Sequence, residues 1–259
     1  MEGATVVIIV EALIVGLAVG AILGLVGAGG AVLAVPAFLY LFDFTALQAT
    51  TASLAVVAVA AAFGAIPRMR LGQVRFRQAL LFWILGVAGT LAGTRIAPHI
   101  PETALIAGFA LVMVGAAFAM WRKGSGPEPV GTRETSLWLT VVVASGVGLL
   151  TGIFGVGGGF LIVPALVLVF GFPFGVAAGT SLVIVALNSV TALVFRADTW
   201  HDIPWQLPLV VIVGGLIGSV IASRANLAVS QRLLERAFAG LLVLLAVWMV
   251  VEALLLGPQ

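Results

Sequence analysis

The chain has 259 residues, of which 62% are hydrophobic and only 8% are charged. A soluble domain carries about 25% charged residues, so this chain cannot cover a surface in water and needs lipid as its solvent. The absence of cysteine excludes disulfides, thiolate catalysis and cysteine-bound metals. The basic residues outnumber the acidic ones only slightly and stand at the ends of apolar runs, so no nucleic acid is expected as a partner.

Charged residues divide the chain into apolar runs, and about 20 residues of helix are enough to cross the hydrocarbon of a bilayer. No basic residues precede the first run, so we interpret it as a span and not as a signal peptide. We therefore expect an all-α, polytopic membrane protein. The long helices are expected, in chain order, at residues 5–26, 46–66, 78–96, 102–121, 136–154, 175–195, 205–224 and 231–254. Two shorter apolar pieces are expected at 31–42 and 159–171.

The two halves of the chain resemble each other. The stretch "GLVGAGGAVLAVP" at 24–36 returns as "GIFGVGGGFLIVP" at 152–164, which is 128 residues later. Ser53 and Ser181 keep the same offset, and Arg95 matches Arg224 after one inserted residue. Unrelated apolar helices would not keep glycine, proline, serine and arginine in one register. We predict a first transmembrane repeat at 1–121, a linker at 122–135 and a second transmembrane repeat at 136–259.

The distribution of Lys and Arg indicates how the two repeats are oriented, because basic residues gather on one side of a membrane. If each short piece crosses, the repeats are inverted and ten of the twelve basic residues share one side. If the short pieces re-enter without crossing, the repeats are parallel and the split is eight to four. The first distribution fits the rule better, so we expect inverted repeats, each of four long helices plus one short helix. Arg68 and Arg196, which match at the 128-residue offset, are expected at the membrane interface.

A glycine-rich break separates a long helix from the short piece in each half. Lipid cannot satisfy unwound backbone, so such a break must be buried in protein or line a cavity. The helix that follows presents free N–H groups and the positive end of its dipole, which favour an anion. Two breaks that meet near the midplane are typical of a transporter binding site, and tight helix packing is the alternative. The candidate substrate-binding glycines are Gly27, Gly29, Gly30, Gly155, Gly157, Gly158 and Gly159.

Hydroxyl side chains follow the short piece in both halves. They either cap the next helices or donate to an oxyanion, and both interpretations stay open. Asn188 lies two turns beyond the second group, roughly on the same helix face, and is a further candidate for the binding site. The hydroxyl residues are Thr50, Thr51, Ser53, Thr180 and Ser181.

Few other side chains are candidates for a functional role. Glu11 is an ionisable group in the first span and a candidate for proton coupling, with snorkelling to the outer interface as the alternative. Asp43 is a candidate cap for the helix that follows it. His99 and His201 lie far apart with no ligand cluster around them, so neither a metal nor another cofactor is expected.

The combined pattern resembles the TauE/SafE family of membrane permeases. The resemblance rests on a glycine-rich break, a short apolar piece with "VP", and "GTSL", and it extends from about Leu13 to Leu245. The first copy departs from the pattern, because it reads "GAGGA" and "TTASL". The resemblance implies transport of sulfur-containing anions such as sulfite, thiosulfate and organosulfonates, often as export.

We therefore expect a secondary transporter that holds a small oxyanion at the glycine breaks and works by alternating access. A passive anion channel of the same architecture is the alternative, whereas an intramembrane enzyme lacks the companion residues that a nucleophilic serine needs. The expected partners are the anion and lipid, with protons as a candidate coupling partner, in a plasma membrane or the inner membrane of a two-membrane cell. The anion, the direction, the coupling ion and the oligomeric state are left open.

Replacement of Gly157 by leucine is expected to abolish transport while the protein still reaches the membrane, since the larger side chain fills the space that the anion needs. Uptake of labelled sulfite or thiosulfate into vesicles, normalised to the amount of protein in the membrane, measures this. Unchanged transport by the Gly157→Leu variant would contradict a binding site at this break.

Overall fold

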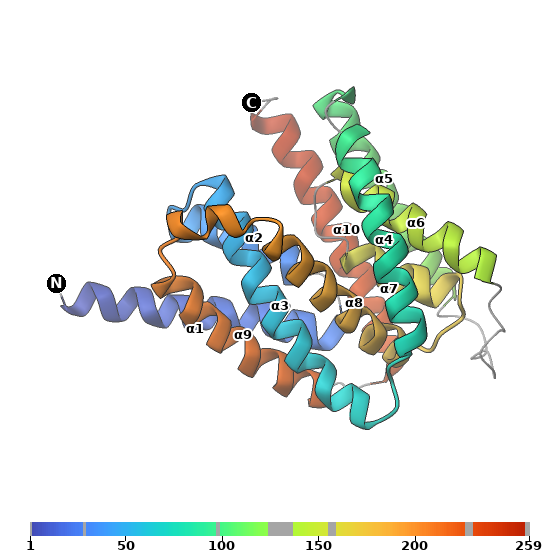
Figure 1. Ribbon diagram of the computed structural model, residues 1–259, viewed down its shortest axis with the longest axis horizontal. Helices are drawn as coiled ribbons and strands as arrows, with labels where there is room; N and C mark the ends of the chain where they lie inside the picture. Colours follow the sequence, from blue (N-terminus) through green and yellow to red (C-terminus); the bar gives the residue numbers. More distant parts are fainter. Residues whose placement is uncertain are drawn as a thin grey trace. The chain divides into compact units, whose positions relative to one another are not determined.

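The computed structural model describes residues 2–27, 30–96, 99–123, 137–154, 159–225 and 230–256 (Figure 1). Within these ranges all regular structure is helical. Five of the helices are long and apolar enough to cross a bilayer, and two shorter apolar helices accompany them. The expected all-α fold with several membrane spans is confirmed. The five candidate spans are Val6–Val26, Ala46–Arg70, Phe76–Ile96, Phe174–Phe195 and Gln206–Ala225.

The helices follow the predicted order of one long, one short and three long helices in each half. The first half contains α1 (Glu2–Val26), α2 (Gly30–Leu41), α3 (Ala46–Arg70), α4 (Phe76–Ile96) and α5 (Glu102–Lys123). The second half contains α6 (Leu137–Phe154), α7 (Gly159–Leu168), α8 (Phe174–Val194), the 3₁₀ segment η2 (Ala197–Asp202), α9 (Gln206–Ala225) and α10 (Gln231–Leu256). Helix α3 continues four residues beyond its predicted end at 66, through Pro67 and two arginines, and α7 ends three residues before 171.

The turn after each short helix has the same geometry in both halves. The backbone N–H of Phe44 donates to Phe38 O at 3.1 Å, and Phe172 N donates to Leu166 O at 3.1 Å. Asp43 and Gly171, which stand 128 residues apart, both have a positive φ, of 54° and 68°. This local agreement supports the internal repeat that the sequence predicts.

Thr45, and not Asp43, caps α3. The Thr45 hydroxyl accepts from the backbone N–H of Gln48, and the Gln48 side chain accepts from the Thr45 N–H, which forms a capping box. The prediction of Asp43 as the cap is wrong, because Asp43 lies two residues before the cap and forms the left-handed turn.

The chain forms two compact units, and each unit combines parts of both halves. The first unit consists of Met1–Ala79 and Ala178–Ala228, and the second of Leu80–Ala177 and Val229–Gln259. The first unit thus contains α1, α2, α3, η2, α9 and most of α8, and the second contains α5, α6, α7, α10 and most of α4.

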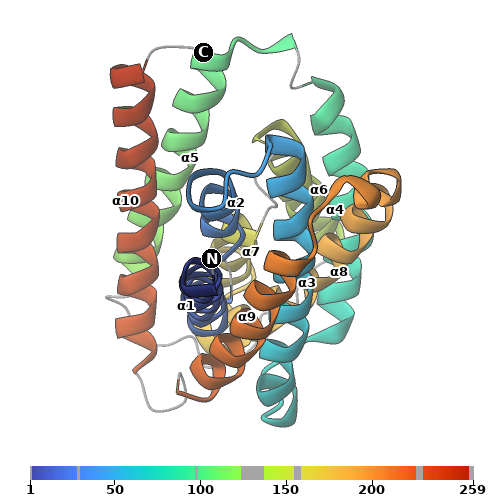
Figure 2. The same cartoon turned by 90° about the vertical axis from the view of Figure 1, so that its left-hand side faces the viewer.

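In the first unit, α1 packs most extensively on α9 and α3 also packs on α9 (Figures 1 and 2). Glycines bring the backbones of α1 and α9 together. A Cβ on Gly20 would overlap the carbonyl of Gly215, and one on Gly24 would overlap the carbonyl of Ser219. Between membrane helices there is no hydrophobic driving force, so the association depends on van der Waals contact at this short range.

The second unit contains the equivalent contact. A Cβ on Gly148 of α6 would overlap the carbonyl of Gly86 on α4, and one on Gly152 would overlap the carbonyl of Thr90. Gly152 matches Gly24 at the 128-residue offset, and Thr90 matches Ser219 at the 129-residue offset, so the two contacts are equivalent in the repeat. Each unit therefore contains a close glycine-lined contact between a helix of the first half and a helix of the second.

The contacts within the first unit also give the directions of its helices. Gly16 lies on Val211, Gly20 on Gly215 and Gly24 on Ser219, so α1 and α9 run in the same direction. Helix α3 shares that direction, because Gly215 lies near Val56 and Gly64 lies on Ser219.

Two further helices of the first unit run the opposite way. Helix α2 returns along α1, since Gly30 lies against Leu23 whereas Phe38 shares a buried cluster with Ala12. Helix α8 begins against Gly27, and Arg196 beyond its end donates to the Thr50 hydroxyl at 2.8 Å, close to the start of α3.

Replacement of Gly20 by alanine is expected to destabilise the protein by about 1–3 kcal/mol, because the added methyl group forces α1 and α9 apart. Gly115→Ala on α5 is the matched control, since a Cβ there meets nothing within 4 Å. That control is expected to be neutral or to stabilise by up to about 1 kcal/mol, because alanine favours helix. Thermal unfolding of both variants in detergent compares them, and equal melting temperatures would argue against the contact.

Candidate functional site

The break in the first half is a buried, tightly packed turn at Gly27. This residue has a φ of 76°, and its backbone N–H donates to Leu23 O at 2.7 Å, which ends α1. A Cβ at Gly27 would overlap the backbone of Ala178 on α8. Glycine is needed here twice over, once for the left-handed conformation and once for the close approach of α8.

A buried arginine satisfies the end of α1. Arg68 is 1% exposed, and its Nη2 donates to Gly24 O at 2.7 Å and to Leu25 O at 3.2 Å. The Ser223 hydroxyl donates to the same Gly24 oxygen at 3.3 Å. These carbonyls belong to the last turn of α1, where no further helical N–H is available to them. A positive charge at this end also complements the helix dipole.

The sequence predicts Arg68 at the membrane interface, but its side chain is buried inside the protein. The sequence predicts an interfacial position for an arginine at the end of an apolar run, because most such side chains extend to the headgroups. Here the side chain turns into the protein, because the end of α1 lies beside the end of α3 and offers carbonyl acceptors. Only the tertiary position of α1 distinguishes the two cases.

The first turns of α8 complete the surroundings of this arginine. A Cβ on Gly179 would overlap the backbone carbonyl of Gln73 and would lie 3.2 Å from Cβ and Cδ of Arg68, so α8 approaches the end of α3 this closely because residue 179 is glycine. The next residue, Thr180, is buried, and its hydroxyl accepts a hydrogen bond from the backbone N–H of Arg75 at 3.1 Å.

Ser181 is fully buried, and its hydroxyl has no hydrogen-bond partner in the described part of the chain. It follows Ala178 by three residues, so it lies on the face of α8 that meets Gly27. A buried hydroxyl that lacks a partner costs about 1–3 kcal/mol. This site is therefore costly for folding and suited to an acceptor that arrives from outside the protein.

The corresponding hydroxyls of α3 are satisfied within their own helix. Thr50 donates to Ala46 O at 2.8 Å, Thr51 to Leu47 O at 2.8 Å and Ser53 to Ala49 O at 2.7 Å. The interpretation of these three residues as helix caps is wrong, because they lie inside the helix and bond back to the carbonyl four residues earlier.

Not all the predicted site residues lie together. The structure brings Gly27, Thr180 and Ser181 to the end of α1, and adds Arg68, which the sequence prediction missed. Thr51 and Ser53 lie on the same helix as Arg68 but roughly 20–25 Å from it along the axis, at 1.5 Å per residue.

The other predicted residues lie elsewhere. Gly30 and Gly159 are buried first residues of α2 and α7, Asn188 is half-buried and Glu11 is exposed. Gly29, Gly155, Gly157 and Gly158 are outside the described residues, as is most of the predicted linker. Among the residues that the structure describes, no three His, Cys, Asp or Glu side chains gather as a metal site would need.

Comparisons with known proteins agree with this architecture. The family model described as sulfite exporter TauE/SafE matches residues 12–249. A probable membrane transporter protein of Xylella fastidiosa is 33% identical over 243 residues, which cover 90% of this chain and 91% of the relative. The probable membrane transporter protein YunE of Bacillus subtilis is 24% identical over 266 residues, which cover 93% and 97% of the two chains. No solved structure matches the chain.

Several bilayer-length helices, together with a buried, polar helix break, define a multi-pass membrane protein of the transporter class. The chain belongs to the TauE/SafE sulfite exporter family. It is a membrane transporter, and the resemblance noted in its sequence is confirmed.

Replacement of Arg68 by methionine is expected to lower stability by about 1–3 kcal/mol, because the carbonyls at the end of α1 lose their buried donor. Arg77→Met is the matched control, since Arg77 is exposed on α4. The melting temperatures of the two purified variants in detergent measure the difference. If Arg68→Met melts like the control, the guanidinium does not hold the end of α1.

Proposed function

We propose that the protein is a secondary transporter of a small sulfur-containing oxyanion, namely sulfite, thiosulfate or an organosulfonate, and that it works by alternating access. The description of the matching family as sulfite exporters supports both the substrate class and export as the direction. The relatives are named only as probable membrane transporters, so they support the transport function and no particular anion.

The observation that carries the proposal is the unpartnered, buried hydroxyl of Ser181 on the face of α8 that meets the Gly27 break. A sulfur oxyanion presents several acceptor oxygens and a negative charge, and it needs donors that replace its water. The Ser181 hydroxyl supplies one neutral donor, and the guanidinium of Arg68, which bonds to the last turn of α1, supplies positive charge to the same break. The first turn of α2, which starts at Gly30 beside the break, adds unpaired backbone N–H groups.

The helix directions in the first unit support inverted repeats. If α2 crosses the membrane, α1 and α3 run in the same direction, and α9 in the inverted second half shares it. The contacts of α1, α3 and α9 have this arrangement. If the short helices did not cross, α3 would run opposite to both α1 and α9. The return of α2 along α1 agrees with the crossing arrangement.

A carrier of this kind draws its driving force from the membrane potential or the proton gradient. We keep Glu11 as a candidate for proton coupling, and the inner or plasma membrane as the location. The breaks in both halves are proposed to meet the anion, with the second half contributing Gly155, Gly157, Gly158 and Gly159, and Asn188 lining the path.

Transport in proteoliposomes tests the proposal. We expect saturable uptake of labelled sulfite or thiosulfate, and acceleration of uptake by unlabelled anion on the opposite side. Counterflow of that kind requires a carrier, whereas a measurable unitary current without counterflow would indicate a channel and overturn alternating access.

The Ser181→Ala variant is expected to raise KM about tenfold or more, because a hydrogen bond to a charged ligand is worth about 1.5–3 kcal/mol. Its thermal stability should not fall, since the hydroxyl has no partner to lose. Thr191→Val, further along α8, is the matched control, because that hydroxyl donates to Leu187 O within its own helix. An unchanged KM in Ser181→Ala, or an equal change in the control, would remove Ser181 from the site.

A further inference from the structure

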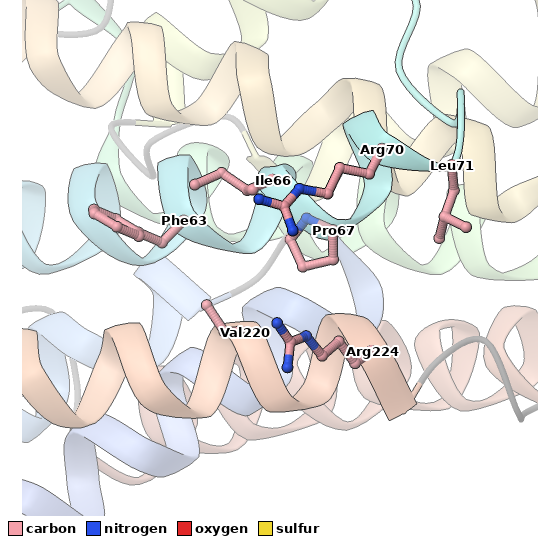
Figure 3. Close-up of a pocket in the computed structure, with 7 residues that line it drawn as sticks. All are labelled: Phe63, Ile66, Pro67, Arg70, Leu71, Val220 and Arg224. Atoms are coloured by element: carbon pink, nitrogen blue, oxygen red, sulfur yellow. The ribbon is translucent and has the colours of Figure 1, made fainter.

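A second polar feature lies at the ends of α3 and α9, within the first unit. A pocket of about 360 Å³ opens between these two helices. Figure 3 shows the side chains that form it, with Pro67 in the middle and one arginine on either side. The lining residues are Phe63, Ile66, Pro67, Arg70, Leu71, Val220 and Arg224.

The pocket contains two cations without a partner. Arg70 is the last residue of α3, Arg224 lies one residue before the end of α9, and both side chains are exposed. Figure 3 shows the guanidinium of Arg70 at α3 and that of Arg224 at α9, with Pro67 between them. Within the described residues neither makes a hydrogen bond or an ion pair. Two like charges that line one pocket repel each other, and a single anion between them would replace repulsion with two charge-assisted contacts.

The rest of the lining is apolar and open. Phe63, Ile66 and Leu71 are 42%, 38% and 51% exposed, and Pro67 and Val220 complete an apolar wall. Both helices are candidate membrane spans that end at Arg70 and Ala225. The apolar wall therefore faces the hydrocarbon, and the arginines stand at the level where the headgroups begin.

We propose that this pocket binds an anionic phospholipid, with the headgroup phosphate between Arg70 and Arg224 and an acyl chain along Phe63 and Ile66. A small inorganic anion fits this pocket poorly, because five of the seven lining residues offer it no hydrogen-bond donor. A zwitterionic lipid brings its own cation next to two arginines. An anionic phospholipid matches both the charge and the apolar wall.

The internal repeat does not provide a second pocket of this kind. Arg70 matches Asp198 at the 128-residue offset, and Arg224 matches Arg95 at the 129-residue offset. Because one of the two matching residues is acidic, the internal repeat does not reproduce the two cations of this pocket. The lipid would bridge the ends of α3 and α9, both of which pack in the unit that contains the Gly27 break.

Lipid titration of the purified full-length protein in detergent, followed by native mass spectrometry and thermal unfolding, tests this proposal. Phosphatidylglycerol is the anionic probe and phosphatidylcholine the zwitterionic one. We expect phosphatidylglycerol adducts and a higher melting temperature in the unmodified protein, and at least a tenfold weaker apparent affinity in Arg70→Gln/Arg224→Gln. The matched control is Arg77→Gln/Arg232→Gln, which removes the same charge from two other exposed arginines and should stay within about twofold.

A third variant tests the apolar wall. Phe63→Ala should weaken phosphatidylglycerol binding without any change in net charge. Equal binding of both lipids, equal loss in the two double variants, or full retention in Phe63→Ala would each overturn the proposal. If inorganic phosphate or sulfite stabilises the protein through Arg70 and Arg224 as strongly as the lipid does, the pocket is a small-anion vestibule instead. Melting curves without added lipid identify any variant that fails to fold.

Discussion

The structure of the first unit depends on one constraint, which is that a helix ending inside a membrane protein must find partners for its last carbonyls without water. Helix α1 ends this way at Gly27. The guanidinium of Arg68 and the hydroxyl of Ser223 bond to the last turn of α1. The positive φ and close packing of Gly27 let α8 approach. Once these contacts are made, a turn that lipid could not tolerate becomes a stable, buried feature.

In each unit, a helix from the first half of the chain packs on a helix from the second half. In one unit α1 of the first half packs on α9 of the second, and in the other α6 packs on α4. Both contacts use glycine at matching positions outside the breaks, where it serves packing. Gly27 serves both the break and the close packing against α8, so the two interpretations of glycine in the sequence do not exclude each other.

Helix α3 joins the break to the membrane surface. Arg68 and Arg70 are two residues apart, so their side chains leave the helix about 200° apart. One is buried against the end of α1 and the other is exposed in the pocket beside α9. A lipid phosphate on Arg70 and an anion near Arg68 would act on opposite faces of the same last turns of α3. The proposed lipid would stabilise the helix end that positions the proposed transport site.

The sequence by itself determined the membrane class, the order of long and short helices, the internal repeat and the family, because apolar runs, glycine breaks and motif spacing are local or periodic features. It placed α2 and α7 correctly after the breaks, but it predicted Asp43 instead of Thr45 as the cap of α3 and missed the burial of Arg68. Only the tertiary structure decided that Arg68 is buried, that Ser181 lacks a partner while Ser53 does not, and that α1 pairs with α9. These facts depend on which helix ends lie side by side, and residues far apart in the chain carry no sign of that neighbourhood in their own sequence.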